Sequence, residues 1–167
     1  MNAEMVKNAL QGDDEALILC LQSISDQMTW TAVSLLGDRE LAKDCIMETT
    51  LKVYKKRKTV KKPEFFKTWV IRILINECKD EMKRLKMYTP LDEHFEIADP
   101  EKENFNFVND LVSKLPLDLK QIIVLKFFDE MNFREIGEVL KTPESTIKSR
   151  YAVALKKLRL EMEEYEQ

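Results

Sequence analysis

The chain has 167 residues, of which 44% are hydrophobic and 34% are charged, and its formal net charge is −3. This length allows one domain or two small ones, and long helical periodicity with only 3 glycines and 5 prolines predicts an all-α protein. No apolar run approaches the roughly 20 residues of a membrane span. The first residues also lack the basic start and apolar core of a secretion signal, so we expect neither membrane insertion nor export.

The cysteines give no sign of a disulfide framework or a metal site. Cys20, Cys45 and Cys78 are far apart and odd in number, and the single histidine, His94, lies in an acidic stretch. This usage predicts reduced thiols and a cytoplasmic protein. We also find no glycine-rich phosphate loop and no convincing nucleophile–base pair, so we expect no catalysis, no cofactor, no metal and no small-molecule substrate.

The distribution of charge along the chain is more informative than its sum. Residues 52–86 carry a net charge of +9 and residues 141–159 carry +5, whereas the rest of the chain is acidic. Two basic segments in an acidic chain predict two separate contacts with a polyanion.

The first half is predicted to be helical throughout. Its expected elements are helices over residues 17–36, 39–57 and 64–86, with a basic loop over 58–63. Gly37 suits the C-terminal cap of the first helix, and Asp38 suits the N-terminal cap of the next.

The second half follows a stretch without helical periodicity. Residues 87–104 hold two prolines and six acidic residues, which favours a flexible linker. We therefore expect two small helical domains, residues 1–88 and 105–167, joined by a flexible acidic linker over 89–104. The expected helices of the second domain lie at about 105–114, 117–129, 132–140 and 143–163.

Within the second domain, FREIGEVLKTPESTIKSRYAVALKKLR, residues 133–159, predicts two helices with a tight turn between them. Gly137 stands where the second helix would cross closely. Thr142 suits a helix cap, and Pro143 suits the first helical position. An exposed second helix rich in basic and hydroxyl side chains is typical of a helix-turn-helix, which places it in the major groove. The alternative is an ordinary αα-hairpin with a solvated face.

Two stretches, in this order, resemble one family. LLGDRELAKDCIMETTLKVYKKR with FFKTWVIRILINECKDEMKR, and LPLDLKQIIVLKFFDEMNFREIGEVLKTPESTIKSRYAVALKKLR, are similar to bacterial RNA polymerase sigma factors of the extracytoplasmic-function (ECF) group of the sigma-70 family. The resemblance implies an alternative sigma factor that directs promoter-specific transcription initiation, including promoter opening. Residues 1–88 would correspond to region 2 and residues 105–167 to region 4.

The resemblance implies a polymerase-docking surface on helix 39–57. Asp44 and Glu48 lie one turn apart on the same face and suit an arginine of a partner; the alternative is two solvated acids. The implied core-binding residues are Asp44, Glu48 and Leu51. Three residues depart from the family pattern and make this surface more apolar and less acidic: Leu41, Lys43 and Met47.

The first basic segment is the expected site of minus-ten recognition and melting. Clustered lysines suit phosphates, and aromatic rings suit unstacked bases. From the charge pattern and the resemblance together, the candidates are Lys55, Lys56, Arg57, Lys58, Phe65, Phe66, Lys67, Arg72, Asn76, Lys79, Asp80, Lys83 and Arg84. For Trp69 core packing is the favoured interpretation, and for Phe66 both roles stay open.

The second basic segment is the expected reader of the minus-thirty-five element. The candidates are Arg134, Ser145, Thr146, Lys148, Ser149, Arg150 and Lys156. Arg150 suits a guanine edge, a phosphate, Glu144 or Glu135, and the sequence does not choose among them. Lys141 replaces the glycine usual in the turn, and a left-handed backbone there would cost about 1–2 kcal/mol. Further departures from the family pattern are Ala152, Val153 and Leu155.

The implied partners are core RNA polymerase, promoter DNA as duplex and as melted non-template strand, and an anti-sigma factor. The linker would allow a closed form and an extended, polymerase-bound form. One alternative is a stand-alone helix-turn-helix regulator, which leaves the segment 52–86 without a role. Another is a module that retains only protein partners.

Overall fold

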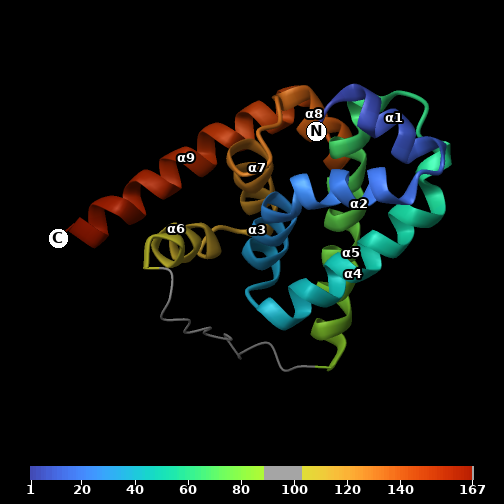
Figure 1. Ribbon diagram of the computed structural model, residues 1–167. Helices are drawn as coiled ribbons and strands as arrows, with labels where there is room; N and C mark the ends of the chain where they lie inside the picture. Colours follow the sequence, from blue (N-terminus) through green and yellow to red (C-terminus); the bar gives the residue numbers. More distant parts are fainter. Residues whose placement is uncertain (89–102, 167) are drawn as a thin grey trace.

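The computed structural model describes residues 1–88 and 103–166, and every regular element within these ranges is helical (Figure 1). The α-helices are α1 (Ala3–Gln11), α2 (Asp14–Ser23), α3 (Ser25–Leu36), α4 (Arg39–Lys56), α5 (Phe66–Tyr88), α6 (Glu103–Ser113), α7 (Leu117–Phe127), α8 (Phe133–Leu140) and α9 (Glu144–Glu166). Two 3-10 helices, η1 (Arg57–Thr59) and η2 (Pro63–Phe65), join α4 to α5. The all-α prediction is confirmed. Of the expected linker, 89–104, all but the last two residues lie outside the described residues.

Two glycine–aspartate pairs set helix boundaries in the first half. Gly12 and Gly37 have φ angles of 122° and 66° and end α1 and α3. The side chains of Asp13 and Asp38 accept hydrogen bonds from backbone N–H groups in the first turns of α2 and α4. The boundary predicted at Gly37 is confirmed. Glycine suits this position because it adopts the left-handed region without a steric cost.

The predicted continuous helix over residues 17–36 is wrong at Ile24, where the chain divides into α2 and α3. Ile24 has φ −114° and ψ 11°. On either side, Ser23 Oγ donates to the carbonyl of Cys20 and Ser25 Oγ donates to that of Gln22. Serine side chains that bond to nearby carbonyls compete with helical hydrogen bonds. Ile24 itself stays buried, so the apolar pattern runs unbroken across the bend.

Helix α5 forms the centre of the first half and packs against α3 and α4 (Figure 1). Five of its side chains that are fully buried are Phe66, Val70, Ile71, Leu74 and Ile75. Burial of side chains of this size stabilises a fold by roughly 1.5–3 kcal/mol each. The position of α5 therefore fixes which of its faces remains available for a ligand.

The two halves share one hydrophobic core. Buried Ile122, Leu125, Ile136, Val139 and Ile147 of α7, α8 and α9 belong to the same cluster as the core of the first half. Helix α8 packs against α5, and α3 packs against α7. A smaller separate cluster lies among α6, α7 and α9.

The turn between α8 and α9 is tight, as the sequence predicts. A Cβ atom on Gly137 would lie 2.7 Å from the backbone oxygen of Thr142. Lys141 adopts the left-handed conformation, with φ 52° and ψ 45°. The hydroxyl of Thr142 donates to the carbonyl of Leu140 at 3.1 Å, which holds the turn from the side of α8.

Candidate polymerase and nucleic-acid interfaces

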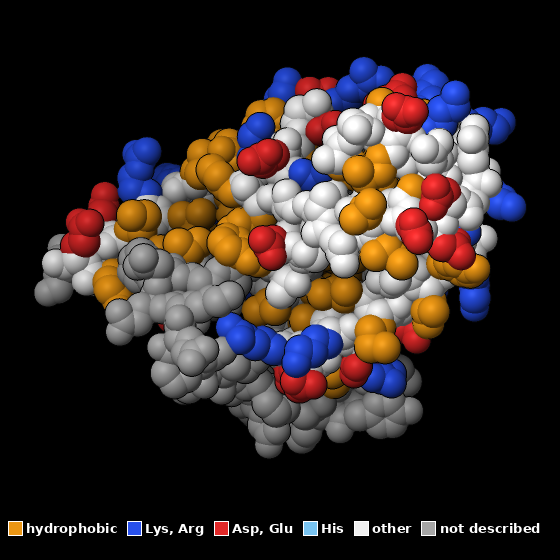
Figure 2. Space-filling view, in the orientation of Figure 1, with side chains coloured by type: hydrophobic (Ala, Val, Ile, Leu, Met, Phe, Trp, Pro, Cys, Tyr) orange, Lys and Arg blue, Asp and Glu red, His pale blue; other side chains and the backbone are white. Residues whose placement is uncertain are grey.

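A basic surface surrounds the connection between α4 and α5, residues 57–65, which we call the α4–α5 loop. Figure 2 shows Lys and Arg side chains along the upper right edge, where Figure 1 places this loop. The exposed lysines on it and its approach are Lys55, Lys56, Lys58, Lys61 and Lys62. Phe65 is 45% exposed, and Lys62 Nζ lies 5.8 Å from its ring centroid. Charge and an accessible aromatic face therefore meet here, as single-stranded binding requires.

Two candidates of this segment are buried. Arg57 donates through Nη2 to Asp14 Oδ1 at 2.5 Å and to the carbonyl of Gly12 at 3.3 Å. Phe66 is fully buried, and its ring centroid lies 6.2 Å from that of the partly buried Trp69. Core packing is thus what the structure gives Phe66 and Trp69.

Helix α5 presents an exposed polar stripe that continues from the α4–α5 loop. The exposed candidates on it are Arg72, Asn76, Asp80, Lys83 and Arg84. Arg72, Asn76, Asp80 and Arg84 follow one another at intervals of four residues, and Lys83 lies three residues after Asp80, so all five lie on one side of the helix. Arg84 Nη2 also pairs with Glu81 at 2.5 Å.

Two further lysine candidates on α5 face the second half. Lys67 Nζ donates to the carbonyl of Asp129 at 2.8 Å. Lys79 is partly buried, and its pKa is lowered by burial and by the neighbouring Lys83 and Lys141. Lysines whose charge is disfavoured in this way gain from the approach of an anion.

On α4, the acidic candidates stand beside exposed apolar side chains. Asp44, Glu48 and Leu51 are all exposed. Met47 and Tyr54 are also exposed, so Met47, Leu51 and Tyr54 form a stripe along the same helix. Tyr54 was not among the predicted site residues, although its spacing of three residues from Leu51 was a usable signal. Exposed large apolar groups next to acids are typical of a protein-binding surface.

The start of α9 is open to solvent. Ser145, Lys148, Ser149 and Lys156 are exposed, whereas Thr146 and Arg150 are partly buried. Lys148 Nζ lies 3.3 Å from Glu144 Oε1. On α8, Arg134 Nε lies 3.6 Å from Glu138 Oε1. These ion pairs are exposed and within one helix, and such pairs are weak enough to exchange for a phosphate.

A buried polar contact that the sequence did not predict joins the two halves. Thr31 Oγ1 donates to Asp129 Oδ2 at 2.7 Å, and both side chains are buried. Burial raises the pKa of Asp129 to about 7, although the hydrogen bond from Thr31 and the charge of Lys67 act in the opposite direction. Nearby, the rings of Trp30 and Phe128 meet edge to face at 5.3 Å between centroids. The partners come from opposite halves of the chain, so no local pattern reveals them.

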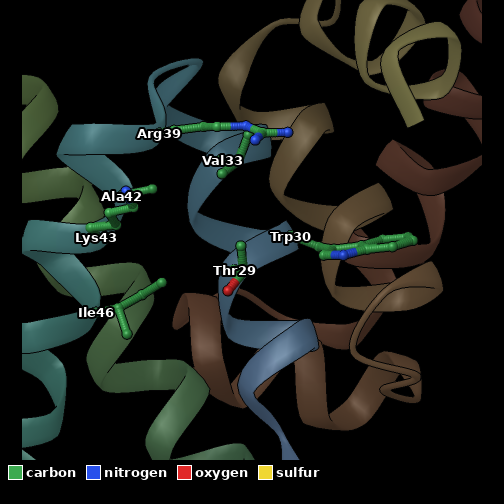
Figure 3. A pocket seen from close by; sticks show the side chains of 7 residues that line it. All are labelled: Thr29, Trp30, Val33, Arg39, Ala42, Lys43 and Ile46. Atoms are coloured by element: carbon green, nitrogen blue, oxygen red, sulfur yellow. The ribbon is translucent and has the colours of Figure 1, made fainter. Parts of the chain in front are cut away.

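A small pocket of about 200 Å³ lies between α3 and α4 (Figure 3). Val33 and Thr29 come from α3, and Ala42, Lys43 and Ile46 come from α4. Figure 3 shows the side chain of Arg39 extending across to α3, and the ring of Trp30 pointing away from α4. The pocket contains none of the predicted site residues.

The described part of the chain holds no group of three or more side chains suited to a metal ion. Cys20, Cys45 and Cys78 are buried free thiols. The pKa of Cys78 is raised, mainly by a hydrogen bond with Cys45 and to a smaller extent by burial. Among the described helices, none combines the length and apolar character that a membrane crossing requires.

Comparison with protein families assigns both halves. The family model for sigma-70 region 2 matches residues 21–87, and that for sigma-70 region 4 matches residues 111–160. The chain belongs to the sigma-70 family. A stand-alone helix-turn-helix regulator has no use for region 2, so that alternative is set aside. The family consists of initiation factors and not of enzymes.

Curated relatives place this sigma factor in the ECF group. It is 29% identical over 150 residues to RNA polymerase sigma factor SigV of Bacillus subtilis, covering 87% of this chain and 90% of the relative. It is 27% identical over 169 residues to the ECF RNA polymerase sigma factor SigW of the same organism, covering 90% of each. The chain is thus an alternative sigma factor that directs promoter-specific transcription initiation.

Solved structures share its fold. CnrH in complex with the cytosolic domain of CnrY matches with a TM-score of 0.74 at 18% identity, covering 96% of both chains. The sigma factor RpoE in complex with the anti-sigma factor NepR from Bartonella quintana matches with a TM-score of 0.73 at 20% identity, covering 86% of this chain and 94% of that one. Both of these proteins were therefore solved with another protein bound.

Proposed function

We propose that this sigma factor acts in the cytoplasm, binds core RNA polymerase through α4, opens the minus-ten element with the α4–α5 loop and α5, and reads the minus-thirty-five element with α9. The separation of surfaces carries this proposal. From Asp44 to Tyr54 the exposed side chains of α4 are acidic and apolar. The exposed charged side chains of the α4–α5 loop and its approach, of α5, and of α9 as far as Arg159 are mostly basic. Surfaces of opposite character suit different partners.

Polymerase binding rests on the stripe of Met47, Leu51 and Tyr54 with Asp44 and Glu48 beside it. The apolar groups supply area to bury, and the carboxylates supply direction toward arginines of the partner. This combination offsets the smaller number of acids on the helix.

Promoter opening requires no bond to break. Each unpaired base that stacks on an aromatic side chain gains roughly 1–3 kcal/mol. Extruding a base from the duplex costs a few kcal/mol. Phe65 offers the stacking surface, the loop lysines hold the backbone, and Asn76 offers an amide that both donates to and accepts from a base edge. The balance favours opening only when several bases are captured together.

Recognition of the minus-thirty-five duplex rests on the exposed start of α9. Its N-terminal turn favours phosphate, and Lys148 and the partly buried Arg150 follow within the next turn. Val153 and Leu155, both exposed and apolar, offer no hydrogen bond to a base edge farther along the helix. We therefore infer a contact set concentrated in the first two turns.

The packed arrangement of the two halves corresponds to a closed form. Lys67 and Lys79, two candidates for minus-ten contact, face region 4 in it. Binding to polymerase and promoter would separate the halves and release these lysines. An anti-sigma factor is a fitting partner of the closed form, because CnrH and RpoE, which share the fold, were solved with the cytosolic domain of CnrY and with NepR.

The test is transcription in vitro with purified core RNA polymerase, this chain and a library of promoter fragments. We expect initiation from a specific subset of fragments. Replacement of both Asp44 and Glu48 by alanine should weaken binding to core enzyme about tenfold or more, since charge-assisted hydrogen bonds to the partner no longer form. Replacement of the exposed acid Glu40, on the same helix, is the matched control. Stable core binding without initiation from any fragment would contradict the proposal.

A further inference from the structure

We propose that Arg57 is a positioning residue for promoter opening: anchored to the junction of α1 and α2, it holds the α4–α5 loop in the conformation that captures unpaired bases. The inference rests on the base-capturing role proposed above for this loop. It gives the α1–α2 hairpin a part in promoter opening although the hairpin carries none of the predicted DNA contacts.

The side chain of Arg57 is committed to protein acceptors. It is only 8% exposed, and its Nη2 atom donates to Asp14 Oδ1 and to the carbonyl of Gly12. Gly12 caps the end of α1, and Asp14 is the first residue of α2. Its Nη1 atom is buried without a hydrogen-bond partner among the described residues, so burial, and not a full set of hydrogen bonds, keeps the guanidinium from a phosphate in solution.

The backbone of Arg57 is the point where α4 becomes the loop. Arg57 is the first residue of η1, and its carbonyl accepts a hydrogen bond from the N–H of Val60 at 3.2 Å. The ring of Tyr54, which is itself exposed, covers the guanidinium, with 4.7 Å from Cζ to the ring centroid. Fixing this one side chain therefore fixes the direction in which the loop leaves α4.

Helix α1 supports the loop along its length. It packs against both η1 and η2. The aliphatic part of Lys58 lies over Gly12, since a Cβ atom there would be 3.7 Å from Lys58 Cε. At the far end of the loop, Phe65 and Lys62 face solvent together. A loop that is already ordered loses less conformational entropy when it captures a base, so its binding is stronger.

Replacement of Asp14 distinguishes a positioning role of Arg57 from a direct DNA contact, because the two roles predict opposite effects on promoter opening. If Arg57 bound phosphate, removal of Asp14 would take away a competing negative charge and leave or strengthen DNA binding. If Arg57 positions the loop, removal of either partner leaves the loop poorly held, and both changes weaken opening.

The experiment compares open-complex formation by full-length holoenzyme on a duplex promoter and on the same promoter with a pre-opened minus-ten region. Permanganate reactivity of unpaired thymines is the readout. We expect Asp14→Ala and Arg57→Ala each to reduce opening of the duplex about tenfold or more, as misplacement of reacting groups does elsewhere. Initiation from the pre-opened template should stay within about twofold, because capture of bases no longer has to offset the cost of unstacking the duplex there. Binding to core enzyme should be unchanged, since the polymerase-binding stripe proposed on α4 is not altered.

Two further variants sharpen the result. Arg57→Lys should give an intermediate reduction. An ammonium group keeps the positive charge, but it ends one atom short of Nη2, the atom that donates to both Asp14 and Gly12, and it lacks the planar guanidinium that Tyr54 covers. Glu15→Ala, next to Asp14, removes the same charge from an exposed side chain and should resemble the unmodified protein. Opening that is unchanged or increased by Asp14→Ala overturns the proposal, as does an equal reduction on both templates.

A double variant, Lys61→Ala with Lys62→Ala, tests separately whether the α4–α5 loop takes part in promoter opening at all. If it and Phe65→Ala leave duplex opening unchanged, the proposed role of the loop itself fails. If they reduce opening while Asp14→Ala does not, the loop keeps its role and the positioning by Arg57 is refuted.

Discussion

Lys141 combines a strained backbone with an unfavourable charge. Its left-handed conformation is required by the short turn between α8 and α9, and such a conformation costs a residue with a side chain about 1–2 kcal/mol. Its ammonium group is also among the causes, after burial and Lys83, that lower the pKa of Lys79. The turn is therefore less stable than its geometry allows.

We expect Lys141→Gly to raise the free energy of unfolding by roughly 0.5–1 kcal/mol. The relief of strain exceeds the additional freedom that glycine gives the unfolded chain. Urea denaturation of the full-length protein measures the change. Lys141→Ala removes the charge and retains the strain, so an equal gain from alanine would show that the backbone is not the cause.

The conformation or partner of some residues can be predicted from the sequence, whereas that of others cannot. The left-handed position at Lys141 was predictable because the turn is local and glycine is usual there. The pairing of Arg57 with Asp14 was not, because it joins residues 43 positions apart and a basic run gives no sign of which member turns inward. The same limit applies to Asn76 and Phe66, of which the structure exposes one and buries the other.

At the scale of elements, α4 and α9 carry different proposed tasks on separate surfaces. Exposed lysines at the start of α9 stand on the helix proposed to read the minus-thirty-five element, whereas the apolar stripe stands on α4. Loss of one task should therefore leave the other intact.

We expect Lys148→Ala and Arg150→Ala to weaken promoter binding by holoenzyme while core binding is retained. A variant that no longer touches one phosphate should show a salt dependence smaller by about one ion, and one that no longer touches a base should bind about 1–3 kcal/mol more weakly. Fluorescence anisotropy of a labelled promoter fragment at several salt concentrations gives both values. Lys157→Ala, at an exposed lysine of α9 outside the predicted set, is the control. A parallel loss of core binding would refute this division of tasks.

The helices themselves were largely predictable, with two exceptions: no separate helix was predicted over the residues of α1, and α2 and α3 were predicted as one helix. Gly37 marks a boundary that is plain in the sequence, because glycine followed by aspartate ends one helix and caps the next. The bend at Ile24 gives no such signal. Ser23 and Ser25 are residue types that also occur within ordinary helices, and a buried isoleucine continues the apolar stripe across the break.

At the scale of the molecule, the closed form depends on a carboxylate in an apolar junction. Asp129 is 1% exposed, and its Oδ1 atom is buried without a hydrogen-bond partner among the described residues. Lys67 is the one charged group among the causes of the pKa shift of Asp129, and its effect is smaller than that of burial. An ionised Asp129 therefore weakens the contact between the halves.

We expect the closed form to become less favoured as the pH rises. The pKa of Asp129 is about 7 in the closed form, and an exposed aspartate has a pKa of about 3.9. Between these values the closed form binds the additional proton, so the ratio of closed to open molecules falls by up to about tenfold per pH unit, and the full penalty is present above about pH 7. Emission from Trp30, which lies against Phe128 in the closed form, measures the change on raising the pH through this range.

The variant Asp129→Asn should abolish this pH dependence and favour the closed form at a pH above the pKa of Asp129. Asp118→Asn, at an exposed carboxylate of α7, should leave the dependence unchanged. A pH dependence that survives in Asp129→Asn would assign it to another group.

The joining of the halves was beyond sequence reasoning. Ile71 and Ile75 have the spacing of any buried helix face, and Ile136 and Val139 complete a similar face in the second half. A pattern of apolar residues shows that a face is covered, and it does not show which helix covers it. The two regions have separate sequence signatures, so they were expected as two domains. The hydrophobic core that continues from one to the other was not expected.

The shared core has a consequence for the exchange of parts between sigma factors. A chimera that takes residues 1–88 from this chain and region 4 from a relative would place Thr31 and Lys67 against a surface that never had to match them. Such a hybrid would lose the closed form before it lost the ability to bind DNA. A second chimera would keep Asp129 and the apolar residues of α7 and α8 from this chain and graft only the start of α9. It would transfer the promoter preference and keep the native contact between the two halves.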